Sequence, residues 1–255
     1  ISLGLNEICF TDHVDYGIKR DWDDPRGIAW RQDAMEPLAN VNYPEYFAKL
    51  LRMRVTYGKA ITIRSGLEFG IQSITVDNYK KLYDRYQDQL DFVLFSMHQV
   101  NNLEFWTQDF QIGKTQQEYN EEYYREILKT MKLFKNYSVL AHLDLLARYD
   151  KKGIYPFEKV EDLIAEILKQ AINDGKGIEV NTSSWHYGLT DTQPSRKILK
   201  LYKDLGGKIV TVGSDAHSTN YLADHIKDAY AILENEIGFE EITTFDHMQP
   251  VFHKL

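Results

Sequence analysis

The chain has 255 residues, of which 43% are hydrophobic and 27% are charged, as is usual for a globular protein with a full core. The formal net charge of −8 argues against nucleic acids and anionic membranes as partners, because both are negatively charged. No apolar run approaches the roughly 20 residues that span a bilayer. The single cysteine, Cys9, cannot form an internal disulfide and fits a reducing compartment, so a cytoplasmic protein is expected.

Short runs of apolar β-forming residues alternate with stretches of helical spacing along the whole chain. The clearest helices are expected at 120–136, 158–173 and 218–236, because apolar residues recur there with the spacing of one buried face. Alternation of this kind predicts a parallel sheet with helices outside it, here as one domain over residues 1–255. Strands are expected at 7–12, 61–67, 92–97, 138–142, 177–182 and 208–214.

Three segments depart from the simple alternation. Residues 14–43 and 99–118 are expected to be long loops, which in compact domains serve either as lids or as surface excursions. Residues 1–6 have the pattern of the tail of a helix, with nothing before it. We therefore expect that a strand and its helix are missing at the amino end, because an open barrel would expose an apolar edge.

The predicted strands run directly into residues that bind metals. In a parallel barrel the carboxyl ends of the strands lie on one face, so these side chains should converge there. The combination predicts a metallohydrolase. A structural explanation exists for single residues, since Glu68 could cap a loop, a histidine could sit in the core, and Asp215 could cap a helix. The candidate ligands are His13, Glu68, His98, His142, Asp215 and His217.

Two further residues are candidates for contact with a substrate. Arg148 follows His142 closely and should lie at the mouth of the barrel, where its planar guanidinium suits a bidentate contact with phosphate. A surface salt bridge is the alternative for Arg148. His186 follows Asn181 by a few residues and could also reach a substrate, or could be a solvated loop histidine.

Several short motifs, in their order along the chain, resemble the polymerase-and-histidinol-phosphatase (PHP) family. His-Leu-Asp-Leu followed by Arg148, Glu-Val-Asn-Thr-Ser at 179–183 and Pro-Ser at 194–195 look most like its histidinol-phosphatase branch. The resemblance covers nearly the whole chain. The motifs are Thr-Asp-His at 11–13, Glu68 after Ser-Gly-Leu, Ser-Met-His at 96–98, Ala-His-Leu-Asp at 141–144 and Ser-Asp-Ala-His at 214–217.

The resemblance implies a fold and a set of metal sites. The family folds as an α/β protein, a distorted seven-stranded (β/α)7 barrel that holds three divalent ions. Only six strands are visible here, so the count implies that the first strand is absent. In the family this strand carries a His-x-His motif, which this sequence lacks. For this chain the resemblance implies two or three divalent ions, namely zinc, iron or manganese.

The resemblance also assigns ligand roles. By this assignment Glu68 bridges the first two ions and Asp215 binds the first. The second ion is completed by His98 and His142, and the third is held by His13 together with His217. The residues expected to act in catalysis are Asp215, His217 and Arg148, with Arg148 and His186 binding the substrate.

The function implied is that of a metal-dependent phosphomonoesterase acting on a small phosphorylated substrate. The expected reaction is hydrolysis of L-histidinol phosphate to L-histidinol and phosphate in histidine biosynthesis, through a hydroxide that bridges two ions. Alternatives are another phosphoesterase of the family acting on phosphotyrosine or nucleotides, a deaminase or amidohydrolase on a related barrel, and a non-catalytic PHP module. The oligomeric state does not follow from the sequence.

The two long loops contain aromatic residues that could select the substrate. They could close over an imidazole-bearing leaving group and exclude water, or they could simply pack the loops onto the barrel. The residues are Trp22, Trp30, Phe105 and Trp106.

Overall fold

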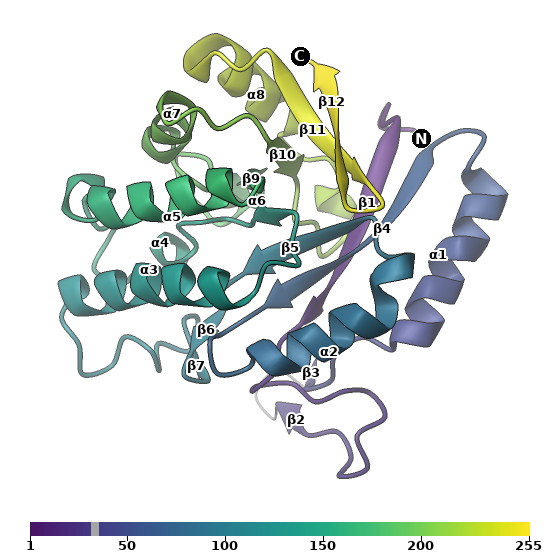
Figure 1. The fold of residues 1–255 in the computed structure, drawn as a ribbon, viewed down its shortest axis with the longest axis horizontal. Coiled ribbons are helices and arrows are strands. Elements are labelled where there is room, and N and C mark those ends of the chain that lie inside the picture. Colours follow the sequence, from purple (N-terminus) through teal and green to yellow (C-terminus); the bar gives the residue numbers. More distant parts are fainter. Residues whose placement is uncertain (32–35) are drawn as a thin grey trace.

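The computed structural model describes residues 1–31 and 36–255, and its centre is one curled sheet of six parallel strands (Figure 1). The order in the sheet is β1-β4-β5-β8-β9-β10, so strands that follow one another in the chain are neighbours in space. All six predicted runs form strands. Their bounds are β1 (Glu7–Val14), β4 (Thr62–Gly70), β5 (Phe92–Ser96), β8 (Val139–Leu140), β9 (Gly177–Asn181) and β10 (Val210–Gly213).

The inner strands of the sheet are buried on both faces, as their apolar runs require, whereas the edge strand β1 is mostly half-buried. In β5 the side chains alternate, with Val93 and Phe95 in the large core cluster beneath the helices. Phe92 and Leu94 lie in a smaller cluster on the other face, together with Phe245. Because neighbouring residues of a strand point to opposite faces, an uninterrupted apolar run is what a strand covered on both sides needs.

The curled sheet has the form of a half-barrel with two edge strands. Within the described residues, β1 pairs with β4 and β10 pairs with β9, each in parallel and each on one side only. The predicted α/β barrel architecture is therefore confirmed in its curled parallel wall. The seventh strand stays a prediction.

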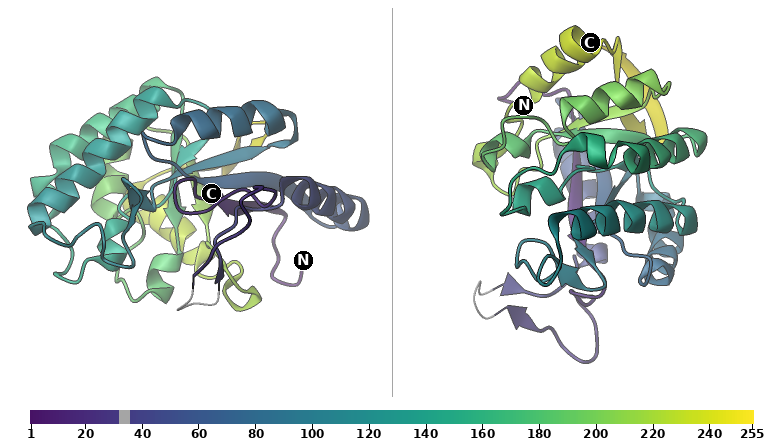
Figure 2. Two further views of the ribbon diagram at one scale, coloured as in Figure 1. Left: turned by 90° about the horizontal axis from the view of Figure 1, so that it is seen from below. Right: turned by 90° about the vertical axis from the view of Figure 1, so that its left-hand side faces the viewer.

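The longer helices lie outside the curled sheet (Figure 2). Two short helices, α4 (Leu146–Tyr149) and α6 (Ser183–His186), lie instead in the segments that follow β8 and β9. Among the described helices none combines the length and the apolar composition that a bilayer crossing needs. The longer helices are α1 (Tyr43–Tyr57), α2 (Val76–Tyr86), α3 (Gln116–Leu133), α5 (Glu161–Asn173), α7 (Arg196–Asp204) and α8 (Ile226–Ala231).

Two of the predicted helices are confirmed with shifted starts. Helix α5 buries Ile164, Ile167, Leu168 and Ala171, as its spacing predicts. It begins at Glu161 because a short 3₁₀ turn, Phe157–Lys159, precedes it. Helix α3 begins earlier than expected, at Gln116, because a capping box formed by the side chains of Thr115 and Glu118 satisfies its first amides.

The helix predicted at 218–236 is wrong in its first half. The chain forms a 3₁₀ turn at Thr219–Tyr221 and then passes through Ala223 and His225, which have φ angles of 61° and 53°. A right-handed helix contains no such angles, so α8 starts only at Ile226. The backbone oxygen of Asp224 accepts a hydrogen bond from Thr182 Oγ1 at 2.7 Å, which ties this irregular segment to the end of β9.

The expectation of a helical tail at residues 1–6 is also wrong. Residues 1–4 form a turn closed by a hydrogen bond from the Gly4 amide to the Ile1 carbonyl. Gly4 has a φ angle of 75°, which glycine adopts readily and a helix excludes. The segment then enters β1 directly.

An antiparallel hairpin near the carboxyl terminus was not predicted. It consists of β11 (Glu241–Asp246) and β12 (Gln249–Lys254). The ring of Phe245 packs on Phe92 with 5.2 Å between centroids, and the Met248 amide donates to the Asp91 carbonyl. The hairpin therefore covers the half-barrel near the amino end of β5, opposite to the end where β2 and β3 lie (Figure 1).

The two long loops each contain a pair of very short strands. In the first, β2 (Trp30–Arg31) pairs with β3 (Glu36–Pro37), and in the second, β6 (Gln99–Val100) pairs with β7 (Leu103–Glu104). The loops are joined by an ion pair from Arg31 Nη2 to Glu104 Oε1 at 2.8 Å, and the Arg31 guanidinium lies 4.5 Å above the Trp106 ring. The first loop is thus fixed to the second.

The packing of the hairpin gives a test of the fold. We expect Phe245→Ala to lower the free energy of unfolding by about 3–5 kcal/mol, because it leaves a cavity against Phe92. The control is Phe252→Ala on the neighbouring strand β12, where the side chain is exposed, with an expected change within about 0.5 kcal/mol. Urea denaturation of both variants measures the difference. Equal effects would mean that the hairpin does not seal the core.

Candidate metal centre

The candidate ligands lie at the carboxyl ends of parallel strands, where the sheet topology brings them together. His13 is in β1 directly opposite Glu68 in β4. The others stand just beyond the ends of their strands, His98 after β5, His142 after β8, and Asp215 with His217 after β10. Residues far apart in sequence therefore meet on one face, as expected for a parallel barrel.

Glu68 is the centre of the first group of side chains. Its Oε1 atom lies 2.9 Å from His98 Nε2 and 3.0 Å from His142 Nε2. Its Oε2 atom lies 3.4 Å from His13 Nε2. Ser96 Oγ donates a further hydrogen bond to Oε1 at 2.8 Å. One buried carboxylate thus faces three imidazole rings, each through its Nε2 atom.

A second group shares His13 with the first. Ligand atoms of His13, Asp215 and His217 all lie within 4.8 Å of one another. The rings of His13 and His217 are 5.5 Å apart, and His217 is mostly exposed. Asp215 Oδ2 accepts a hydrogen bond from Ser183 Oγ at 3.1 Å. The structure therefore brings all six predicted residues into one continuous cluster, with His13 in the middle.

Charges in the cluster are strongly coupled. Burial by itself raises the pKa of the Glu68 carboxyl, but His13, His142 and His98 together hold that pKa well below its usual range. Burial lowers the pKa of His98, yet Asp15 and Glu68 more than offset it and raise the pKa to about 10. The carboxylates thus favour positive charge on His98, and a bound divalent cation would supply positive charge in the same place.

The donor atoms fit a divalent metal ion. His13 Nε2 and His142 Nδ1 are buried and have no hydrogen-bond partner among the residues that the structure describes, which is costly for a polar atom unless something else binds it. A ring nitrogen of His13 lies within 4.8 Å of ligand atoms of Asp215 and His217, so a cation held by these side chains would give the ring a partner. Neutral imidazoles combined with carboxylates are the ligands that zinc, iron and manganese accept.

Two of the candidate ligands have a strained backbone. His142 has a φ angle of 25° and Asp215 one of 48°, which residues other than glycine rarely adopt. Neighbouring groups compensate at His142, where the backbone amide donates to Glu179 Oε2 at 3.2 Å. Such strain is concentrated at functional sites, where the surrounding structure holds a side chain in a direction it would not take alone.

Arg148 lies beside Asp215 and is buried. Its Nη1 atom is 3.6 Å from Asp215 Oδ2. Gln193 Oε1 accepts from both Nε and Nη2, at 3.0 and 2.8 Å, and Ser183 Oγ accepts from Nη2 at 2.7 Å. The alternative of a surface salt bridge is wrong, because the side chain is only 5% exposed. These contacts fix the orientation of the guanidinium at the edge of the cluster.

His186 lies next to the cluster, in a small pocket of about 100 Å³ that also contains Asp215 and His217. Its ring stands 3.8 Å from the ring of Tyr221. Tyr187 lines the same pocket, and its ring lies under the guanidinium of Arg148 at 4.1 Å. The pocket therefore has aromatic walls directly beside the candidate ligands.

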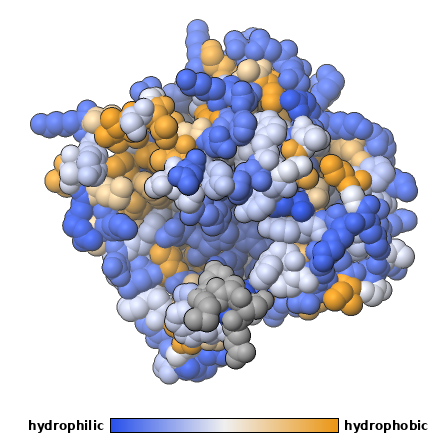
Figure 3. All heavy atoms as spheres, turned by 180° about the vertical axis from the view of Figure 1, so that it is seen from behind, coloured by the Kyte–Doolittle hydropathy of each residue, from blue (hydrophilic) through white to orange (hydrophobic). Residues whose placement is uncertain are grey.

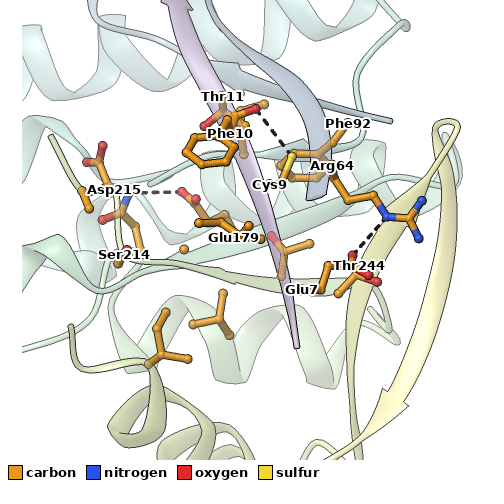
Figure 4. A pocket seen from close by; sticks show the side chains of 18 of the residues that line it. Glu7, Cys9, Phe10, Thr11, Arg64, Phe92, Glu179, Ser214, Asp215 and Thr244 are labelled. Carbon is orange, nitrogen blue, oxygen red and sulfur yellow. Dashed lines mark hydrogen bonds and ion pairs between the residues drawn. The ribbon is translucent and has the colours of Figure 1, made fainter. Parts of the chain in front are cut away.

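A larger cavity of about 490 Å³ extends from the cluster between β1 and β10. Figure 4 shows its lining, with Asp215 and Glu179 at one end and Arg64, Glu7 and Thr244 at the other. The face opposite to Figure 1 is hollowed near its centre, where hydrophilic residues gather (Figure 3). The cluster meets solvent through His13 and His217, whereas Glu68 and His142 are buried.

Sequence reasoning missed two acidic residues of this site. Asp15 follows His13 by two positions and contacts both His98 and His13. In the sequence, Glu179 stands out only as the first residue of the Glu-Val-Asn-Thr-Ser motif. Burial and the nearby charges of Glu68 and Asp215 raise the pKa of Glu179 to about 8. The signal that could have found Asp15 is an acidic residue at the end of a strand, because Asp15 stands just past the end of β1.

The aromatic loop residues are only partly available to a ligand. Trp22, Trp30 and Trp106 are exposed, whereas Phe105 is fully buried. The hypothesis that Phe105 closes over a substrate is wrong, because its ring packs against Phe110 and Tyr123 in the core.

The model of the PHP domain matches residues 1–183 of this chain. This match spans more than half of the sequence and includes the first four candidate ligands. The chain belongs to the PHP domain family.

A relative and a solved structure each match this chain over most of their own length. A histidinol-phosphatase of Lactococcus lactis subsp. lactis is 30% identical over 98% of this chain and 86% of its own. The crystal structure of histidinol phosphate phosphatase from the same organism, complexed with zinc, L-histidinol and phosphate, is 28% identical and has a TM-score of 0.79. It aligns with 98% of this chain and 89% of its own.

A second solved structure, of a protein from Listeria monocytogenes, is 18% identical. It has a TM-score of 0.75 and covers 89% of each chain. At this identity the likeness concerns the fold alone. The half-barrel and its outer helices are therefore an architecture shared with solved proteins.

The central position of Glu68 can be tested by metal binding. Replacing Glu68 with Gln keeps the shape but removes the negative charge that would hold cations between the imidazoles. We expect Glu68→Gln to bind at least tenfold less tightly to zinc in equilibrium dialysis, with a circular dichroism spectrum like that of the wild type. The control is Glu126→Gln, which removes a largely buried glutamate on α3 outside the cluster. Full zinc binding by Glu68→Gln would mean that this carboxylate is not a ligand.

Proposed function

We propose that this protein is a metal-dependent histidinol-phosphatase that hydrolyses L-histidinol phosphate to L-histidinol and phosphate, with residues 1–255 acting as one domain. The observation that carries the proposal is the likeness to the Lactococcus lactis enzyme, whose crystal structure contains zinc, L-histidinol and phosphate. That likeness extends over 98% of the present chain. The reaction belongs to histidine biosynthesis.

The ions of the proposed enzyme would be held by the cluster described above. We assign Glu68, His98 and His142 to one ion, with Glu68 shared with a second ion at Asp215. His13 and His217 would hold a third. When bound, such ions supply Lewis acidity toward phosphate oxygens and acidify a water molecule. Zinc is the ion of the Lactococcus lactis structure and is the first to test, with iron and manganese as the alternatives.

Arg148 is proposed to hold the phosphate group of the substrate. Gln193 and Ser183 orient its guanidinium beside Asp215, so its charge is fixed where phosphate oxygens would lie against the ions. A cation oriented in advance loses little entropy when the ester binds. This role uses the planar, bidentate geometry of arginine, which a lysine would not supply.

His186 is proposed to contact the leaving group. Its pocket is narrow, has the rings of Tyr187 and Tyr221 as walls, and opens beside Asp215 and His217. The leaving group, L-histidinol, carries an imidazole ring, and stacked aromatic rings attract one another beyond the effect of burial. A substrate with its phosphate at the ions could therefore place this ring among the aromatic residues of the pocket.

A panel of phosphate esters tests the proposal against its alternatives. The zinc-loaded protein should show its highest kcat/KM with L-histidinol phosphate, compared with phosphotyrosine, a nucleoside monophosphate and p-nitrophenyl phosphate. Glu68→Gln serves as the blank for contaminating phosphatases. A preference for phosphotyrosine or the nucleotide would assign the chain to another phosphoesterase of the family. No turnover above the blank would favour the non-catalytic module.

Arg148 should affect substrate binding far more than stability. We expect Arg148→Ala to lower kcat/KM for L-histidinol phosphate. The expected decrease corresponds to a loss of about 2–4 kcal/mol of transition-state stabilisation, which is the usual cost of removing one partner of a buried charge pair. Inhibition by inorganic phosphate should weaken in parallel, because phosphate presents the same oxygens. The control is Arg125→Ala, an exposed arginine of α3. Unchanged phosphate inhibition would contradict the assignment.

His186 should distinguish substrates by their leaving groups. Loss of a ring contact worth about 0.5–1.5 kcal/mol predicts that His186→Ala raises KM for L-histidinol phosphate roughly 2- to 10-fold. The KM for p-nitrophenyl phosphate should change less, because that ester lacks the imidazole and the ammonium group. His247→Ala, at a mostly exposed position of the β11–β12 turn, is the control. An equal rise with both esters would place His186 outside the leaving-group site.

A further inference from the structure

Asp15 contacts two of the candidate ligands at once. Its carboxylate is buried just after the end of β1. The Oδ1 atom lies 2.7 Å from His98 Nδ1, and the Oδ2 atom lies 3.5 Å from His13 Nδ1. One oxygen of Asp15 thus faces Nδ1 of His98, and the other oxygen faces Nδ1 of His13.

The opposite nitrogens of both rings face Glu68. His98 Nε2 is 2.9 Å from Oε1 of Glu68, and His13 Nε2 is 3.4 Å from Oε2. The two rings are stacked, with 4.9 Å between their centroids and 26° between their planes. A pair of parallel imidazoles is therefore held between two carboxylates, with Asp15 on the Nδ1 side and Glu68 on the Nε2 side.

The position of Asp15 is itself fixed by its surroundings. Lys19 Nζ forms an ion pair with Oδ2 at 3.2 Å. The backbone amide of Asp15 donates to Asn40 Oδ1 at 2.9 Å. Gly70 leaves the necessary space, because a β-carbon there would lie 2.0 Å from Asp15 Oδ1 and 2.7 Å from His98 Nδ1. Lys19 and Gly70 thus lie against the carboxylate, and Asn40 holds the backbone that carries it.

We propose that Asp15 is a positioning residue that fixes the tautomer of both His13 and His98. A neutral imidazole carries one proton and binds a metal through the other nitrogen. An acceptor at Nδ1 keeps the proton there and leaves the Nε2 lone pair directed at the Glu68 side. Histidines that bind metals commonly donate their other N–H to such a partner, which orients the ring.

The arrangement couples the two groups of ligands. In the proposed function, on which this inference rests, His98 and His13 belong to different ions. A single carboxylate that orients both rings therefore supports two sites, and its loss should weaken both. Lys19 contributes by holding the Oδ2 atom, the one that faces His13.

Zinc affinity of Asp15→Asn tests the inference without any substrate. Asparagine has nearly the same shape, but its single oxygen can accept from only one Nδ1–H and its amide group would point at the other ring. We expect a 10- to 100-fold loss of zinc affinity, measured by competition with a chelator, and the loss should appear at more than one bound ion. Unchanged affinity at every site would overturn the inference.

The matched control is Asp91→Asn. Asp91 is equally buried, but it lies at the amino end of β5, where it pairs with Arg54 at 2.5 Å. Its loss should destabilise the fold and leave zinc affinity within twofold of the wild type. If Asp91→Asn lowered the affinity as much as Asp15→Asn, the effect would be one of general destabilisation, and the inference would fail.

A measurement on the wild-type protein does not depend on how the variants fold. In the zinc-loaded chain with ¹⁵N-labelled histidine, His13 and His98 should each carry the proton on Nδ1 and bind through Nε2. Binding of either ring through Nδ1 would overturn the inference while leaving the proposed function intact. Failure of the wild-type chain to bind zinc at all would overturn both.

Discussion

The buried carboxylate of Glu68 is the group on which the rest of the site depends. A charge in the interior of a sheet is costly unless it is paired and hydrogen-bonded, and here His13, His98 and His142 supply the pairing. These residues come from strands that are far apart in the sequence. Only a parallel sheet, whose carboxyl ends meet at one edge, brings them to the same carboxylate. The parallel sheet therefore places the histidines, and the histidines make the buried charge of Glu68 tolerable.

Several acidic side chains gather at this site, and a phosphate ester could bind beside them only if cations were bound there too. Glu68, Asp15, Glu179 and Asp215 lie close together in a protein with a net charge of −8. Ionised carboxylates repel a phosphate ester unless positive charge beside them offsets their own. Bound divalent ions reverse the local charge, and Arg148 adds a fixed positive group at the edge of the cluster. A phosphate-binding site can thus be built largely from acidic and neutral ligands.

Rigidity around the ligands has a cost that the neighbouring packing offsets. His142 and Asp215 adopt positive φ angles, and hydrogen bonds from their surroundings, such as that between the His142 amide and Glu179, hold them there. The side chains outside the cluster act in the same way, since Gln193 orients the arginine and Asp15 faces two imidazoles. In the proposed enzyme, the geometry of the metal ligands would therefore depend on the contacts that these ligands make with neighbouring side chains.

The sequence by itself determined the six strands, the helices α3 and α5, and the six candidate ligands, because runs of apolar residues and the polar residues that end them are local signals. Tertiary structure decided what depends on distant partners. The β11–β12 hairpin packs through Phe245 on Phe92. The positive φ angles of Ala223 and His225 delay the start of α8, in a segment that Thr182 ties to the end of β9. Asp15 acquires its place only when β1 and β5 bring His13 and His98 side by side, which no local pattern contains.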